Sequence, residues 1–149
     1  MEDKLKIALA CDHGGFALKG VLMEHLKERG MECVDFGCFS TESCDYPEFS
    51  EKAARAVAAG ECRFGVVVCT TGIGVSICAN KVRGVRCALC HEPWSAQMTR
   101  RHNDANMLAL GAGVTGPKLA VDILDAFLDA SFEGGRHQRR VDQMMAIEP

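Results

Sequence analysis

Short apolar runs alternate along the chain with amphipathic stretches, and this alternation constrains the fold more than any other feature. The stretches between the runs carry apolar residues three and four positions apart, which is typical of helices. Strands that alternate with helices favour right-handed crossovers and a parallel sheet. We therefore predict an α/β fold, a Rossmann-like three-layer α/β/α sandwich with a parallel sheet of about five strands. The predicted strands are Lys6–Cys11, Glu32–Phe36, Phe64–Cys69, Val85–Cys90 and Met107–Leu110.

Three helices are indicated by apolar spacing and by their ends. Phe16–Arg29 and Lys118–Ala130 each carry a leucine-rich stripe of helical period, which we interpret as core. Pro47 lies in the expected first turn of a helix over Glu48–Ala59, because proline is favoured at helix starts. With 149 residues, the chain has the length of one ordinary domain, so we predict a single domain over residues 1–149.

Composition excludes several classes of partner. A formal net charge of -3 provides no broad basic field, so neither nucleic acid nor an anionic membrane is an expected partner. No apolar run approaches the roughly 20 residues that a membrane helix needs. Met1–Lys6 carries two acidic residues, unlike a secretory signal, and nine cysteines then indicate a reducing cytoplasmic location. Cys87 and Cys90 have metal-like spacing, but no second such pair follows, so we predict no metal.

A buried strand that ends at Cys69 and opens into a glycine loop is the main candidate for chemistry. Glycines in this loop let backbone N–H groups approach an anion at the start of the next helix. A helix N-terminus also stabilises a thiolate, which could serve as base or nucleophile. The alternative is a small buried cysteine at a strand end. Both interpretations stay open at this point; ligands bind at the carboxyl ends of strands in such sheets, and this loop lies at one of them.

Three further groups could contribute to a site. Asp12 and His13 follow the first strand, where they could transfer protons, although Asp12 could equally cap a helix. His102 lies in a polar, ionisable segment between a helix and a strand. Arg136 and Arg140 are four residues apart on one helix face, which suits a phosphate or a solvated surface.

Nucleotide and phosphatase functions fail on spacing. The loop after Cys69 lacks the Gly-Lys-Ser/Thr ending of a triphosphate site, and Ile77 stands where a dinucleotide fingerprint requires glycine. A cysteine phosphatase would need an arginine at the position of Val75. Spacing therefore disfavours a nucleoside triphosphate site, a nicotinamide site and covalent phosphoryl transfer.

Several separated motifs occur in order over almost the whole chain: Cys11-Asp12-His13, Asp45-Tyr46-Pro47, Cys69-Thr70-Thr71-Gly72-Ile73-Gly74, Ala79-Asn80-Lys81, His102-Asn103-Asp104 and Glu133-Gly134-Gly135-Arg136-His137. With these motifs in register, the chain resembles type B ribose-5-phosphate isomerases. Subunits of galactose-6-phosphate isomerase are a poorer match, because they tend to lack the histidine that His102 matches.

The resemblance implies interconversion of ribose 5-phosphate and ribulose 5-phosphate without metal or organic cofactor. It implies that Cys69 is the base, that Thr71 and the loop backbone stabilise an enediolate, and that His102 opens the furanose ring. Some members use a glutamate as base at the position of Val75, which valine cannot replace. A homodimer with shared active sites is also implied, with a tetramer of such dimers as an alternative. The implied substrate contacts come from Asp12, His13, Tyr46, Thr70, Gly72, Ile73, Gly74, Asn103, Arg136 and Arg140.

One position departs from the family pattern. Many members carry a phosphate-binding arginine where this chain has Gly113. The change leaves open a pocket for a six-carbon sugar phosphate such as allose 6-phosphate. A further alternative is a sugar-phosphate binding module without catalysis, in which Cys69 would be inert.

Overall fold

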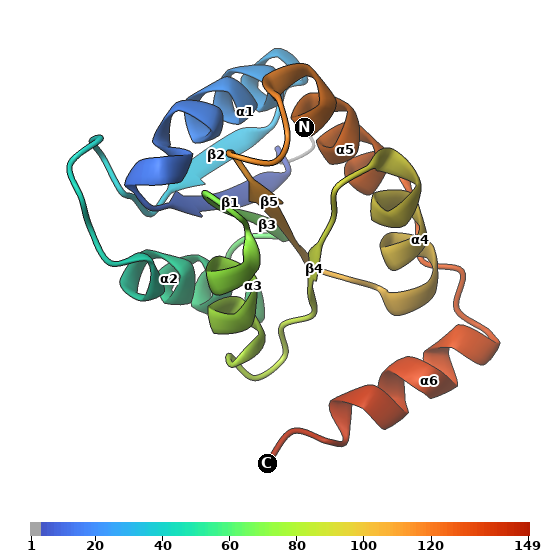
Figure 1. The fold of residues 1–149 in the computed structure, drawn as a ribbon. Coiled ribbons are helices and arrows are strands. Elements are labelled where there is room, and N and C mark those ends of the chain that lie inside the picture. The colour runs from blue at the N-terminus through green and yellow to red at the C-terminus, as the bar shows by residue number, and fades with distance from the viewer. Residues whose placement is uncertain (1–3) are drawn as a thin grey trace.

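The computed structural model describes residues 4–149, so the first three residues of the acidic opening segment lie outside it (Figure 1). Five parallel strands form one sheet in the order β2-β1-β3-β5-β4. This arrangement confirms the predicted fold class. Among the described residues, no helix combines the length and apolar character needed to cross a membrane. The strands are β1 (Lys6–Cys11), β2 (Glu32–Asp35), β3 (Phe64–Cys69), β4 (Cys87–Leu89) and β5 (Met107–Gly111).

Helices cover both faces of the sheet. One apolar core lies between the sheet and α1, α4 and α5, and a second lies between the sheet and α2 and α3 (Figure 1). Neighbouring residues of β3 serve opposite cores, because side chains alternate across a strand. The helices are α1 (Phe16–Glu28), α2 (Tyr46–Ala58), α3 (Ile73–Asn80), α4 (Pro93–Asn103), α5 (Pro117–Asp129) and α6 (Arg136–Met145), with a 3₁₀ turn over His13–Gly15.

The strand order predicts a ligand site between β1 and β3. From β1 the chain moves outward to β2 and then returns to β3 on the other side of β1. The connections after β1 and β3 therefore run in opposite directions, and such a switch point leaves a crevice at the carboxyl ends of the strands. The segments after Cys11 and Cys69 both begin at this edge.

Two predicted elements need correction. The strand predicted over Val85–Cys90 is shorter, because the Val85 N–H closes a turn onto Val82 and the Arg86 N–H donates to the Asn106 side chain. Helix α2 begins two residues before the predicted start, with Pro47 in its first turn as predicted. The other predicted ends of these strands and helices match the structure or differ from it by one residue.

Helix α6 is peripheral to the sandwich. It packs against α4, and the segment after it returns to the loop before β4, where the Glu148 carboxylate accepts the Gly84 N–H at 3.0 Å (Figure 1). Only His137 and Val141 of its residues are buried. Most of α6, including both predicted phosphate-binding arginines, therefore remains exposed in a single chain.

Candidate active site

The loop that joins β3 to α3 folds closely around the sulfur of Cys69. The thiol lies at the end of β3 with the residue 5% exposed, and the Gly72 N–H donates to its Sγ at 3.1 Å. Gly72 has φ of 77°, a left-handed conformation that glycine adopts without a steric penalty. A Cβ on Gly72 would lie 2.8 Å from the carbonyl carbon of Leu110, so the close packing also requires glycine.

Two other buried thiols, Cys11 and Cys90, have raised pKa values. Burial raises the pKa of the Cys11 thiol to about 12 and the pKa of the Cys90 thiol to about 11. Both thiols therefore stay protonated near neutral pH. Neither is suited to act as a base there.

The start of α3 supplies backbone donors beside Cys69. The first intrahelical bond runs from the Ser76 N–H to the Gly72 carbonyl, at 3.3 Å. The Ile73 N–H donates to the Thr71 hydroxyl at 3.2 Å. The N–H groups of Gly74 and Val75 precede the first intrahelical donor and so have no acceptor within the helix. This end of α3 can therefore stabilise negative charge on a bound oxygen.

The turn after β1 faces this loop. Asp12 is buried, and its Oδ1 accepts the N–H groups of Gly14 at 2.9 Å and Gly15 at 3.2 Å. The capping interpretation of Asp12 is therefore correct for the 3₁₀ turn. The exposed His13 accepts the Cys44 N–H on its Nδ1 at 3.2 Å. A Cβ on Gly14 would overlap the Thr70 hydroxyl, which shows how closely the two segments approach.

Tyr46, at the start of α2, packs against the loop that follows Cys69. A Cβ on Gly74 would lie 2.5 Å from Cε1 and 2.7 Å from the hydroxyl of Tyr46, so the phenol ring lies against the loop backbone. The structure therefore brings together one set of predicted residues, here called the thiol set: Cys69, Thr70, Thr71, Gly72, Ile73, Gly74, Asp12, His13 and Tyr46.

Gly113 lies beside the same loop. Its N–H donates to the Thr70 carbonyl at 2.8 Å, and the neighbouring Ala112 N–H donates to the Cys69 carbonyl at 2.8 Å. A Cβ at Gly113 would lie 3.0 Å from Cγ2 of Thr70. An arginine at this position would therefore begin beside the thiol set, and glycine leaves that space open.

The remaining predicted residues, here called the arginine set, lie elsewhere in the chain: His102, Asn103, Arg136 and Arg140. Helix α4 starts beyond the carboxyl end of β4 and ends before β5 begins, so His102 lies at the amino edge of the sheet. Cys69 pairs with Gly111 at the far end of the five-residue strand β5. About 13 Å of strand, at 3.3 Å per residue, separates the two edges. One chain therefore does not bring the two sets together.

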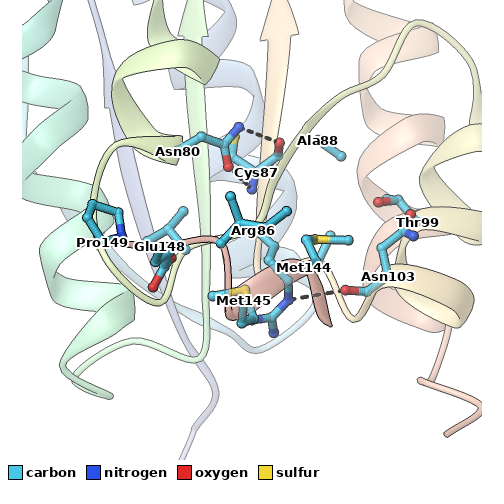
Figure 2. A pocket seen from close by; sticks show the side chains of 13 residues that line it. Asn80, Arg86, Cys87, Ala88, Thr99, Asn103, Met144, Met145, Glu148 and Pro149 are labelled. Atoms are coloured by element: carbon cyan, nitrogen blue, oxygen red, sulfur yellow. Dashed lines mark hydrogen bonds between the residues drawn. The ribbon is translucent and has the colours of Figure 1, made fainter. Parts of the chain in front are cut away.

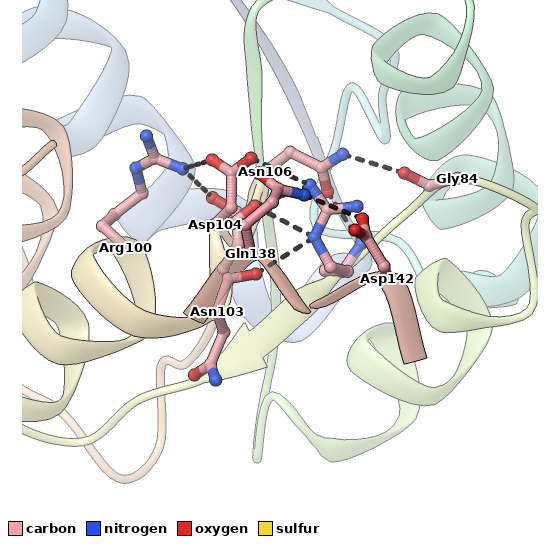
Figure 3. A network of polar contacts seen from close by, with 9 residues as sticks. Gly84, Arg100, Asn103, Asp104, Asn106, Gln138 and Asp142 are labelled. Atoms are coloured by element: carbon pink, nitrogen blue, oxygen red, sulfur yellow. Dashed lines mark hydrogen bonds and ion pairs between the residues drawn. The ribbon is translucent and has the colours of Figure 1, made fainter. Parts of the chain in front are cut away.

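Asn103 belongs to a polar network at this amino edge. Its carbonyl accepts the Nε–H of Arg86 at 3.1 Å, and Arg86 also donates to the Asp104 carbonyl at 2.8 Å (Figure 3). Asn103 also lines a cavity of about 550 Å³ between β4 and the C-terminal segment (Figure 2). No other predicted site residue lines that cavity.

Sequence reasoning assigned no role to Glu133 and His137, which surround His102. The rings of His102 and His137 stack with centroids 4.3 Å apart and planes 8° apart. Glu133 lies beside both rings and accepts the Nε–H of Arg101 at 2.5 Å. Within residues 4–149, His102, Glu133 and His137 are the one group of three with possible metal-ligand atoms all within 4.8 Å of one another. Glu133 and His137 both belong to the Glu133–His137 motif. Their spacing of four residues was the available sequence signal that the two side chains could act together.

A family model described as Ribose/Galactose Isomerase matches residues 7–144. The chain belongs to the ribose/galactose isomerase family. Ribose-5-phosphate isomerase B of Escherichia coli K12 is 52% identical over 143 residues, which cover 96% of each chain. This agreement confirms the resemblance inferred from the motifs.

Solved structures of the ribose/galactose isomerase family support the same assignment. Ribose-5-phosphate isomerase B of Clostridium thermocellum is similar with a TM-score of 0.95 and 52% identity, covering 97% of each chain. The Mycoplasma genitalium enzyme with bound ribulose-5-phosphate has a TM-score of 0.94 and 38% identity, covering 99% of this chain and 98% of that one.

Proposed function

We propose that the protein interconverts D-ribose 5-phosphate and D-ribulose 5-phosphate without a metal or organic cofactor. The observation that carries the proposal is the placement of Cys69 at a strand end, with its sulfur against the Gly72 N–H and the start of α3. Two relatives named for this reaction, each 52% identical, support the same substrate class.

The thiol set suits proton transfer between adjacent carbons. Isomerisation of an open-chain aldose requires a base that removes the C2 proton and returns a proton to C1. Cys69 is the proposed base. The enediolate formed between these steps carries negative charge on its oxygens, which the Thr71 hydroxyl and the free amides at the start of α3 would stabilise. Asp12 and Tyr46 would contact the sugar hydroxyls, and His13 would contact the phosphate.

Ring opening requires a second acid–base group. When the furanose opens, the C1–O4 bond breaks, the O1 hydroxyl loses a proton and O4 gains one. His102 is the proposed group for these transfers, with Asn103 beside it. Arg136 and Arg140 would bind the phosphate in bidentate fashion.

We further propose that the active form is a homodimer with shared sites. The amino edge that carries His102 is about 13 Å of strand away from the edge that carries Cys69. Helix α6 lies outside the three layers of the sandwich (Figure 1), and its Arg136 and Arg140 are exposed. A second copy would allow the arginine set of one chain to complete the thiol set of the other.

Substitution of Cys69 tests the reaction. We expect Cys69→Ala to lower kcat for ribose 5-phosphate by at least about 10²-fold, since a general base contributes roughly 10²- to 10⁴-fold. The Kd of ribose 5-phosphate should change little, because the thiol is not a proposed binding group. Cys33→Ala, at a half-buried thiol on β2, is the matched control. Full activity in Cys69→Ala, or an inactive wild type, would refute the proposal, and the latter would favour a binding module.

Mixing two inactive variants tests the shared site. Co-expressed Cys69→Ala and His102→Gln chains should regain about one quarter of wild-type activity, since half of randomly formed dimers are hybrids with one intact site of two. No recovery in confirmed hybrid dimers would show that each site is built from one chain.

A hexose 6-phosphate isomerase is the second candidate, and the open space at Gly113 favours it. The mechanism would be unchanged, but the phosphate would lie farther from the reacting carbons. Comparison of kcat/KM for ribose 5-phosphate and allose 6-phosphate decides between the two substrates.

A further inference from the structure

Helices α4 and α6 meet at a small polar cluster, here called the joint: Arg101, His102, Glu133 and His137. Arg101 and His102 lie in the last turn of α4, and His137 lies in the first turn of α6. Glu133 is tied to Arg101 twice, because its N–H donates to the Arg101 carbonyl at 3.0 Å and its carboxylate accepts the Arg101 Nε–H. The segment that leads into α6 is therefore held in place at the end of α4.

The joint restrains the ring of His102 in two ways. One face of this ring lies on the buried ring of His137, with the planes only 8° apart. At the ring edge, Nε2 of His102 lies 3.9 Å from Oε2 of Glu133, and Nε2 of His137 lies 3.6 Å from Oε1. The stack limits tilting of His102, and the carboxylate favours an orientation with Nε2 near negative charge.

Metal binding is the alternative use of these side chains. Two imidazoles and a carboxylate form a set that zinc accepts. However, imidazole lone pairs lie in the ring planes, so two nearly parallel rings do not direct them toward one point. One carboxylate oxygen is also already bonded to Arg101. The geometry therefore favours holding a ring over coordinating an ion.

The charges around the joint also favour holding the ring of His102 in place. Arg101, Arg136 and Arg140 provide the nearby positive charge. The hydrogen bond from Arg101 lowers the pKa of Glu133, so its carboxylate stays charged. Burial lowers the pKa of His137, with help from His102 and Arg136, so its ring stays neutral near neutral pH. His102 is thus stacked on an uncharged ring and lies beside a fixed anion.

We propose that Glu133 and His137 are positioning residues that hold His102 in the orientation required for ring opening. This inference rests on the proposed function, in which His102 acts on the furanose. His137 lies directly beside Arg136 in α6, so the joint also fixes His102 relative to the proposed phosphate-binding helix. The two residues act through His102 and do not touch the reacting atoms.

Comparison of a cyclic and an acyclic substrate isolates this role. D-Ribulose 5-phosphate has no furanose form, because the C5 oxygen that would close onto C2 carries the phosphate. Its enolisation in D₂O introduces deuterium at C1, and this exchange requires the base but no ring opening. Ribose 5-phosphate exists as a ring and requires both steps. A defect confined to ring opening therefore affects one measurement and spares the other.

We expect Glu133→Gln and His137→Ala to lower kcat for ribose 5-phosphate by on the order of 10- to 100-fold, as misplacement of a catalytic group does. Deuterium exchange into ribulose 5-phosphate should remain near the wild-type rate. His137→Phe, which restores a flat ring against His102, should recover most of the loss caused by His137→Ala. Arg139→Gln, an exposed change on the same helix, should leave both rates unchanged and serves as the control.

Two results would overturn the proposal. Ribose 5-phosphate turnover could stay at the wild-type level in Glu133→Gln, or both rates could fall together, which would mean that the joint only docks α6. Because Glu133 is exposed, Glu133→Gln decides the question even if His137→Ala does not fold. A wild type that neither converts nor exchanges would instead refute the proposed function itself, before any variant is compared.

Discussion

Lys19 is a buried lysine whose removal should destabilise the fold measurably. Its residue is 2% exposed, and its ammonium donates to Oδ1 of Asp35 and to the carbonyl of Cys38, both at 2.6 Å. These two bonds join α1 to the end of β2 and to the loop that follows. The Cys38 N–H in turn donates to the Cys11 carbonyl at 2.8 Å, next to Asp12. Lys19→Met keeps the length of the side chain and removes the charge.

The expected cost follows from what remains after the change. Removing one partner of a buried ion pair costs about 3 to 5 kcal/mol, because the other charge is left uncompensated. Asp35 keeps 25% of its side-chain surface exposed, so water can partly solvate it. We therefore expect the low end, a loss of about 3 kcal/mol. For a chain of this length, that loss lowers Tm by roughly 6 to 12 °C.

Urea unfolding, followed by circular dichroism, measures the free energy of unfolding of Lys19→Met and of the wild type. Lys52→Met is the matched control, because Lys52 forms an exposed pair with Glu48 at 3.2 Å, and such pairs contribute about 0 to 1 kcal/mol. If Lys19→Met destabilised the protein no more than Lys52→Met, the buried pair would not be the tie between α1 and β2 inferred from its geometry.

Two further predictions concern the crevice and the joint. Gly74→Ala should displace the Tyr46 ring, because the new Cβ would lie 2.5 Å from Cε1 of Tyr46, and should lower kcat/KM for ribose 5-phosphate on the order of 100-fold. Gly20→Ala, whose Cβ would meet nothing within 4 Å, is the control and should leave kcat/KM unchanged. Equal kcat/KM values for the two variants would contradict the packing argument. Because the pKa of His137 is lowered in the folded chain, the unfolded chain binds more protons than the folded chain as pH falls below the ordinary value of 6.5, and the free energy of unfolding should decrease there. Urea unfolding at about pH 7.5 and 5.5 should show a smaller decrease in His137→Phe than in wild type. Equal decreases would show that another group is responsible.

The sequence predicted the strands that are buried on both faces better than the edge of the sheet. β1 and β3 have the predicted bounds, because a run of apolar residues is sufficient to specify a strand that is covered on both sides. The edge strand β4 is shorter than predicted because the Arg86 N–H donates to the side chain of Asn106. A contact with a distant side chain leaves no signal in the local apolar pattern.

In the candidate site, too, some arrangements could be predicted from the sequence and others could not. Most residues of the thiol set lie at or just after the ends of β1 and β3, so the parallel sheet alone was enough to predict that they lie at one edge, whereas Tyr46 begins α2 and was predicted only through the resemblance. The stack of His102 on His137 depends on how α6 docks on α4, and the burial of Lys19 depends on Asp35 lying beneath α1. Neither arrangement follows from the spacing of residues within one helix.

The position of Cys69 on the central strand has a consequence for heat inactivation. β3 is paired on both sides and buried along its length, so it belongs to the part of the molecule that opens last. Within one chain α6 buries only His137 and Val141, so it should open before β3. On warming, phosphate binding by the arginines of α6 should therefore weaken while the Cys69 sulfur keeps its native surroundings. Heat inactivation should begin as a loss of substrate affinity and only later become a loss of turnover.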